Sequence, residues 1–143
     1  VVNATTAIGV SGLVDAVAIA AGNAHSCAVT SAAGMKCWGA NDKGQLGTGQ
    51  VGGASLSPAV VQGLPSATRL ALGGAHTCAL TTDGRVFCWG SNVGGQLGDG
   101  GSADRGAAAP VKMTSGMSFQ TSISAGLRRP KTACLTAQTG ARN

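Results

Sequence analysis

The sequence contains no glutamate and no tyrosine, and only two Phe and two Trp occur among its 143 residues. Without glutamate, hydrolase sites built on paired Glu side chains are excluded. The longest apolar run is six residues, whereas about 20 are needed to span a bilayer, so no membrane span is expected. Leu, Ile, Val and Phe together number 27, against 24 Gly and 25 Ala. A core this poor in large side chains has to form by close packing of the backbone, which repeated units achieve well.

The net charge of +5 is concentrated at one end of the chain. Residues 1–127 carry six basic and five acidic side chains, and the other four cations are Arg128, Arg129, Lys131 and Arg142. A nucleic-acid-binding surface needs Lys and Arg spread over a face to neutralise several phosphates. A short basic cluster beside a nearly neutral body does not supply this, so nucleic acid is not expected as a partner.

An internal repeat of 51 residues dominates the sequence. Shifting the chain by this interval aligns residues 19–49 with residues 70–100, and 16 of the 31 aligned positions are identical. The repeats extend over about 10–60 and 61–111, and a third begins in residues 112–126 before the similarity fades. The chain therefore divides into a repeat region, 1–126, and a degenerate or truncated basic tail, 127–143. Repeats of this length are typical of propellers and related arrays.

Each repeat predicts β-structure, so the expected fold class is all-β. In the second repeat two short apolar runs flank Thr82-Asp83-Gly84, a three-residue hairpin loop with Gly in the left-handed position. This loop pairs Cys78 with Cys88 and makes both faces of the hairpin apolar. A sheet that is apolar on both faces has to lie between neighbours, as a blade of antiparallel strands in a β-propeller does.

Three further expectations concern the rest of each repeat. A strand near residues 16–20 and 67–72 leads into each hairpin. The hairpin of the first repeat is expected to have a longer turn, because Gly34 lies one residue later than the position equivalent to Gly84. Pro58 and Pro110 are expected in long connections between the repeats.

The recurring residues resemble those of a known family. The pattern Ala/Leu-Gly-x-x-His-Ser/Thr-Cys-Ala-Val/Leu-Thr, followed by Cys-Trp-Gly-x-Asn-x-x-Gly-Gln-Leu-Gly, occurs twice with identical spacing. It is similar to the repeat of the regulator of chromosome condensation (RCC1) family. The residues that carry the pattern are His25 and His76, Trp38 and Trp89, Gly39 and Gly90, Asn41 and Asn92, and Gln45 and Gln96.

The resemblance implies a seven-bladed β-propeller in which each repeat supplies most of one blade. This chain holds two full repeats and part of a third, so it is expected to be a fragment whose partners include the remaining blades of a longer propeller. Some members of the family are guanine-nucleotide exchange factors for a small nuclear GTPase and bind chromatin. Bacterial relatives include secreted inhibitors of β-lactamases that use the propeller face.

Four of the five cysteines occur as C-x9-C within the two hairpins. The hairpin register places Cys27 opposite Cys37 and Cys78 opposite Cys88, at a separation that a disulfide tolerates. Two disulfides are therefore predicted, with two pairs of buried thiols as the alternative, and disulfides imply an oxidising compartment. A zinc site is disfavoured because the close Cys-x-x-Cys spacing is missing. The partner expected for Cys134 falls just beyond Asn143.

No catalytic site, metal or cofactor is expected. His25 and Cys27, like His76 and Cys78, are two residues apart, which in a strand separates them by about 6.5–7 Å and prevents a nucleophile–base pair. A histidine that recurs in both full repeats is better explained by hydrogen bonds that connect one strand to the next. Trp38 and Trp89 are expected to pack between blades, and the Gly-rich loops lack a phosphate-binding pattern.

Side chains that differ between the two repeats are the candidates for partner binding, because specificity is commonly carried by loops on a rigid frame. They include Asp42, Lys43, Val93 and Asp99, with the segments 50–57 and 101–109. The function expected is a non-catalytic protein–protein interaction module from an exported bacterial protein, secreted or at the cell surface. The alternatives are an intracellular nucleotide exchange factor or chromatin-associated regulator, and a structural repeat array of a cell-surface protein.

Overall fold

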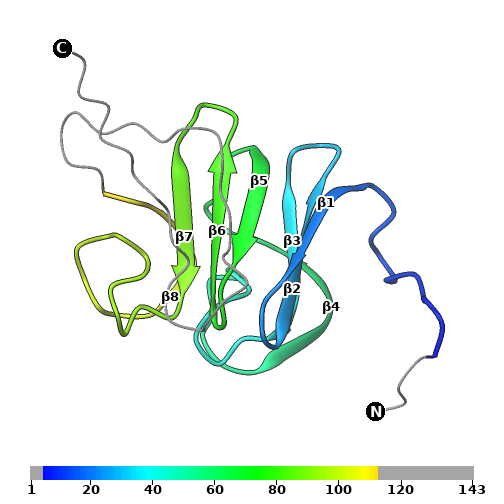
Figure 1. The fold of residues 1–143 in the computed structure, drawn as a ribbon, viewed down its shortest axis with the longest axis horizontal. Helices are drawn as coiled ribbons and strands as arrows, with labels where there is room; N and C mark the ends of the chain where they lie inside the picture. The colour runs from blue at the N-terminus through cyan, green and yellow to red at the C-terminus, as the bar shows by residue number, and fades with distance from the viewer. Residues whose placement is uncertain (1–4, 113–143) are drawn as a thin grey trace.

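The computed structural model describes residues 5–112, which form eight β-strands and no helix. The strands are β1 (Ala16–Ala21), β2 (His25–Thr30), β3 (Met35–Ala40), β4 (Ala54–Val60), β5 (Ala67–Leu72), β6 (His76–Thr81), β7 (Val86–Gly90) and β8 (Arg105–Pro110). They build two antiparallel sheets of four strands, in the orders β1-β2-β3-β4 and β5-β6-β7-β8 (Figure 1). We call these sheets blade 1 and blade 2.

The predicted hairpin register is confirmed in both blades. Cys27 lies opposite Cys37, and Cys78 lies opposite Cys88. The longer turn predicted for the first repeat is wrong, because both turns contain three residues. Ala33 adopts the left-handed conformation (φ 58°) that Gly84 adopts in blade 2 (φ 79°). Alanine adopts this conformation only at a steric cost. The sequence therefore suggested Gly34 as the left-handed residue, although Ala33 takes that position.

The fourth strand of each blade was not predicted. Pro58 and Pro110 lie in β4 and β8 rather than in connections, and the segments 50–57 and 101–109 are only partly loop. Both strands are the outermost of their sheets, and an edge strand tolerates proline because the missing N–H faces away from the ladder.

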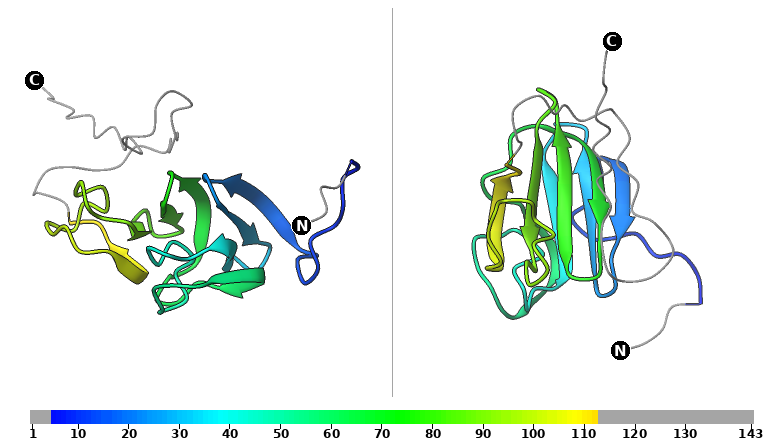
Figure 2. Two further views of the ribbon diagram at one scale, coloured as in Figure 1. Left: turned by 90° about the horizontal axis from the view of Figure 1, so that it is seen from below. Right: turned by 60° about the vertical axis from the view of Figure 1, so that its left-hand side comes forward.

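The core lies between the two blades, which stand side by side with their strands running in similar directions (Figure 2). Cys27, Val29 and Leu46 of blade 1 pack there against Phe87 and Trp89 of blade 2. A second cluster lies on the other side of blade 2 and comprises Cys78, Leu80, Val86, Cys88 and Leu97. The two faces predicted for the second hairpin are therefore the two faces observed. No helix in the described part of the chain is long and apolar enough to cross a membrane.

The antiparallel order brings the longer loops to one end of the blades. The β3–β4 loop (41–53) and the β7–β8 loop (91–104) lie at this end, together with the short turns 22–24 and 73–75 (Figure 1). We call this end the loop edge. The hairpin turns at 31–33 and 82–84 lie at the opposite end.

Candidate functional site

A buried chain of hydrogen bonds joins blade 1 to blade 2. His25 Nε2 lies 2.9 Å from Thr77 Oγ1, and the Thr77 hydroxyl donates to the Gln45 carbonyl at 2.9 Å. Trp89 Nε1 donates to the same carbonyl at 3.0 Å. Because the single Thr77 proton goes to Gln45, His25 Nε2 has to be the donor to Thr77, which fixes the neutral tautomer. We call this arrangement the blade joint.

Each histidine of the repeat packs closely against a glycine. A Cβ at Gly22 would meet the His25 ring at 2.5 Å, and one at Gly73 would meet the His76 ring at 2.1 Å. Burial lowers the pKa of His25 to about 4, with the proximity of His76 as a second cause, and burial also lowers the pKa of His76. Within residues 5–112, His25 Nδ1 and His76 Nε2 are buried without a hydrogen-bond partner.

Asparagine and glutamine side chains hold the loops of the loop edge. Asn41 Oδ1 accepts from the Leu46 amide at 3.0 Å, and Asn92 Oδ1 accepts from the Leu97 amide at 3.0 Å. The Gln45 and Gln96 side chains accept at 2.8 Å from the amides of Lys43 and Gly94. Leu46 and Leu97 are buried at the base of their loops. The shared Asn-x-x-Gly-Gln-Leu-Gly sequence therefore specifies one rigid loop shape, used twice.

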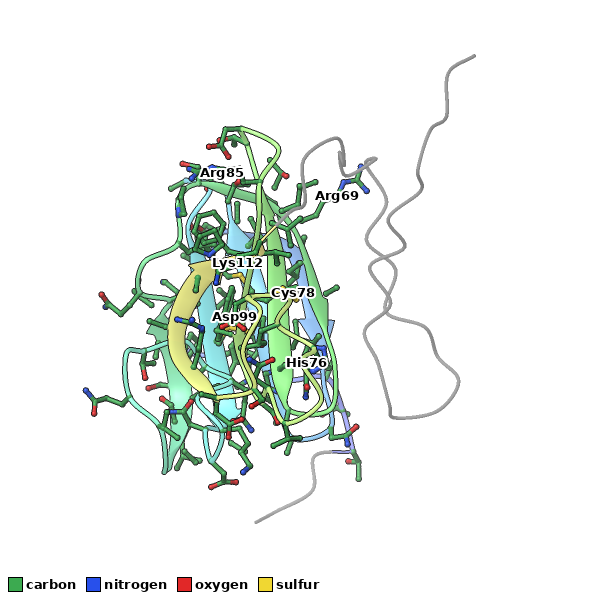
Figure 3. The ribbon with its side chains drawn as sticks, turned by 90° about the vertical axis from the view of Figure 1, so that its left-hand side faces the viewer. Arg69, His76, Cys78, Arg85, Asp99 and Lys112 are labelled. Atoms are coloured by element: carbon green, nitrogen blue, oxygen red, sulfur yellow. A yellow bond between two sulfur atoms is a disulfide. The ribbon has the colours of Figure 1, made fainter. Side chains whose placement is uncertain are left out.

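Both predicted disulfides are present. Their Cα–Cα distances are 4.1 Å for Cys27–Cys37 and 4.2 Å for Cys78–Cys88. The first lies in the core between the blades, and the second lies on the far side of blade 2, near His76 (Figure 3). All four sulfur-bearing side chains are buried, so reagents in solution reach them only when the structure around them opens locally. Cys134 lies outside the described residues.

Glycine and tryptophan recur for different reasons. Gly39 (φ 106°) and Gly90 (φ 100°) have positive φ, and a Cβ would lie 2.5 Å from the Ala24 carbonyl oxygen or 2.6 Å from that of Ala75. Trp89 is fully buried between the blades, whereas Trp38 is half-buried on the side of blade 1 that faces away from blade 2. The two tryptophans hold equivalent positions, and only one of them has a described blade against it.

Three of the four variable side chains come together on the surface of the loop edge. Asp42, Lys43 and Val93 are exposed there, and Val93 is 74% exposed. Lys43 Nζ lies 3.4 Å from Asp104 Oδ2, so an ion pair spans the two blades at this end. No pattern within one repeat points to Asp104, because its partner lies in the other repeat.

Asp99 is buried and serves the loop itself. Its carboxylate accepts from the Gly101 amide at 2.8 Å and from Asn92 Nδ2 at 3.1 Å, and it pairs with Arg105. The Gly101 hydrogen bond and then the Arg105 contact lower the pKa of Asp99 to about 2. The side chain is therefore ionised and occupied within the β7–β8 loop.

The arrangement supplies a rigid frame with a polar edge. Residues 5–112 contain no group of three or more His, Cys, Asp or Glu side chains able to hold a metal ion. The two histidines are buried, and the hydrogen-bond partner of His25 Nε2 is the hydroxyl of Thr77, which itself donates to a backbone carbonyl. Consecutive four-stranded antiparallel sheets that stack through such a joint define neighbouring blades of a β-propeller.

Comparison with protein-family models identifies the kind of propeller. Two models of the regulator of chromosome condensation (RCC1) repeat match the chain, one over residues 16–45 and 67–96 and the other over residues 37–80 and 83–128. The chain belongs to the RCC1 repeat family.

Relatives share the repeats within longer proteins. Probable E3 ubiquitin-protein ligase HERC4 of Rattus norvegicus is 41% identical over 92 residues, which is 62% of this chain and 9% of the relative. Protein RCC2 homolog of Danio rerio is 41% identical over 83 residues, 57% of this chain and 17% of the relative. The chain thus spans less than a fifth of either relative.

Solved structures show the same blade arrangement. Prp20p of Saccharomyces cerevisiae superimposes with a TM-score of 0.69 at 20% identity, covering 78% of this chain and 29% of Prp20p. Human WBSCR16 superimposes with a TM-score of 0.64 at 27% identity, covering 74% of this chain and 28% of that protein. These likenesses confirm the partial RCC1-type propeller expected from the sequence.

Proposed function

We propose that this chain is a non-catalytic protein-binding module whose contact surface is the loop edge. One observation carries the proposal. The buried side chains shared by the two repeats are used inside the frame: the joint binds His25 and Trp89, and the loops bind Asn41, Asn92 and Gln45. What remains exposed at the loop edge differs between the repeats, as a surface selected for a particular partner would.

Structural relatives support binding as the general activity. A crystal structure of Prp20p is accompanied by its binding properties to Gsp1p and histones, and Kap60 has been solved bound to yeast RCC1 (Prp20). Those partners belong to the yeast protein. They support a role in protein recognition for the blades that the two proteins share. Under this proposal, the exposed side chains of this chain determine which partner it binds.

The test is a comparison of three immobilised forms of the chain against proteins of the producing cell. The loop-edge variant combines Asp42→Ala, Lys43→Ala and Val93→Ala. The control is Arg69→Ala, which removes an exposed cation on β5 outside the loop edge. A partner retained by the native chain and the control but lost by the loop-edge variant supports the proposal. A partner that binds all three forms alike contradicts it.

A nucleotide exchange factor is distinguished by activity rather than binding. Adding the chain to a small GTPase loaded with a fluorescent guanine nucleotide is expected to leave the release rate unchanged. Accelerated release at catalytic amounts of the chain would contradict a plain binding role and favour exchange.

We also propose that the chain works in an oxidising compartment, as an exported or cell-surface protein. The two buried disulfides support this, because such bonds persist mainly outside the reducing cytosol. Cells producing the protein would be treated with a thiol-blocking reagent under denaturing conditions at the moment of lysis, followed by peptide mapping. Intact Cys27–Cys37 and Cys78–Cys88 pairs are expected, and blocked thiols at all four positions would contradict the location.

A further inference from the structure

The two loops of the loop edge begin with the same turn, so their exposed positions can be compared one by one. In each loop the amide of a glycine donates to the carbonyl of an asparagine at 2.9 Å, which closes a β-turn of sequence Asn-x-x-Gly over 41–44 and 92–95. The two central residues of each turn are exposed. They are Asp42 and Lys43 in blade 1, and Val93 and Gly94 in blade 2. Equivalent positions of the two turns therefore present different chemistry to a partner.

One carboxylate connects the two turns. Asp104 Oδ1 accepts from the Asn92 amide at 2.8 Å, and Asp104 Oδ2 lies 3.4 Å from Lys43 Nζ. Lys43 directly follows Asp42, and Asn92 directly precedes Val93. Asp104 therefore restrains the distance between Asp42 and Val93, although these two residues belong to different blades.

Asp42 is the charge that this arrangement leaves available. The loops and turns of the loop edge contain four charged side chains. Lys43 pairs with Asp104, and Asp99 pairs with Arg105 at the start of β8. Within residues 5–112 the exposed Asp42 carboxylate takes part in no hydrogen bond and no ion pair. Its negative charge is therefore free to attract a cation of a partner.

Val93 supplies an apolar contact at the equivalent position of blade 2. Its side chain is 74% exposed, and the next two residues are Gly94 and Gly95, so a partner can approach it closely. Covering such a side chain with an apolar group removes it from water and favours binding. The other exposed valine of the loop edge, Val51, lies outside the two turns.

We infer that the loop edge recognises a protein segment that presents a basic side chain beside an apolar one, with the cation against Asp42 and the apolar group against Val93. The inference rests on the proposed function and adds the chemistry of the partner. Asp42 and Val93 determine the specificity, because they are exposed and differ between equivalent positions. Asp104 is a positioning residue. It connects the two turns, and by binding Lys43 it keeps that ammonium group from neutralising Asp42.

The probe is a library of random peptides displayed on phage and selected on the immobilised 143-residue chain. The native chain is expected to enrich peptides in which Lys or Arg lies close in sequence to an apolar residue. Asp42→Lys should reverse the selected charge, so that Asp or Glu takes the place of Lys or Arg. Val93→Ser should remove the apolar preference and keep the basic one.

Two matched variants control for charge and for exposed apolar surface. Asp83→Lys reverses another exposed carboxylate, which lies in the hairpin turn at the opposite end of blade 2. Val51→Ser replaces the exposed valine outside the two turns. Both controls should select the same peptides as the native chain.

Calorimetric titration with a synthetic copy of the most enriched peptide measures each contribution. Asp42→Asn keeps the shape and removes the charge, so it should weaken binding by about fivefold and reduce its salt dependence. Asp42→Lys should weaken binding by at least about 30-fold. Asp104→Asn releases Lys43 beside Asp42 and should weaken binding by about threefold. Adding Lys43→Met to Asp104→Asn should restore the native affinity, which a merely structural role of Asp104 does not predict.

The outcomes separate this inference from the proposed function. Selected peptides that bind the loop-edge variant as tightly as the native chain would overturn both, because binding then occurs elsewhere on the chain. Peptides that lose binding to the loop-edge variant, but carry no basic preference or bind the Asp42→Lys chain unchanged, would overturn the inference alone. A library from which the native chain enriches no peptide over the Asp42→Lys chain overturns the inference as well.

Discussion

Acidification is expected to weaken the blade joint through His25. Burial lowers the pKa of this side chain from 6.5 to about 4 in the folded protein, so the neutral ring is the form that the fold accepts. The unfolded chain takes up a proton as the pH falls through 6.5, and the folded chain takes it up only near 4. Stability is therefore fully present above pH 6.5, declines below it and levels off below the folded pKa.

The size of the effect follows from the two pKa values. Between about pH 7.5 and pH 5 the contribution of His25 falls by about 2 kcal/mol, and the lowered pKa of His76 adds to the loss in the same direction. Asp83 and Asp99 do not contribute in this range, because their pKa values are lowered from 3.8 and both side chains stay ionised in folded and unfolded chain at pH 5.

Urea unfolding followed by tryptophan fluorescence measures the loss, because Trp89 is fully buried in the folded chain. An NMR titration of the His25 ring under native conditions measures its pKa directly, without any variant that could fail to fold. Equal unfolding free energies at the two pH values, or a folded-state pKa of 6 or above, would refute the assignment of a neutral, buried donor.

Other perturbations test the joint, the turns and the disulfides. Thr77→Val should lower the free energy of unfolding, measured in urea, by about 2 kcal/mol, because it leaves His25 Nε2 without an acceptor. Ser26→Val, at the equivalent position of blade 1, should change the free energy of unfolding by less than about 0.5 kcal/mol. Ala33→Gly should raise the melting temperature and Gly84→Ala should lower it, each by the equivalent of about 0.5–1 kcal/mol, since both positions have positive φ. Shifts of the same sign would contradict the equivalence of the two turns. Native protein without reductant should resist alkylation at both disulfides, and reduction should cost each hairpin somewhat less than about 3 kcal/mol. Intact mass after alkylation measures the resistance, and thermal unfolding with and without reductant measures the loss of stability. Alkylation of all four hairpin cysteines in the native, unreduced protein would contradict the pairing.

The repeat made much of the fold predictable from the sequence. A three-residue turn in one hairpin fixed the register, and the shift of 51 residues transferred it to the other. The disulfides and the division of residues between the two faces followed from that register. What the comparison of repeats could not supply was the fourth strand, because β4 and β8 contain proline and differ in sequence. Their pairing depends on position at the sheet edge rather than on local pattern.

The blade joint could not be predicted from the sequence for a different reason. His25 and Thr77 are 52 positions apart, one more than the repeat interval, so no property of a single repeat places them together. The usable signal was that both repeats carry a hydroxyl directly after the histidine. For Asp99 the sequence predicted the wrong position. A charged side chain that differs between the repeats suggested an exposed role in partner binding, but Asp99 is buried. Its neighbours Asn92, Gly101 and Arg105 instead bind it within the loop.

The joint also explains why neighbouring blades depend on one another. Blade 1 contributes a histidine and a loop carbonyl to the joint, and blade 2 contributes a hydroxyl and a tryptophan. The Cys27–Cys37 disulfide crosslinks the hairpin that carries His25, which lies opposite Gly39 two residues from the disulfide. In a repeat array, stability is approximately the sum of a contribution from each repeat and a contribution from each contact between neighbouring repeats. The two described blades are held together by this joint, by the apolar core between them and by the Lys43–Asp104 ion pair.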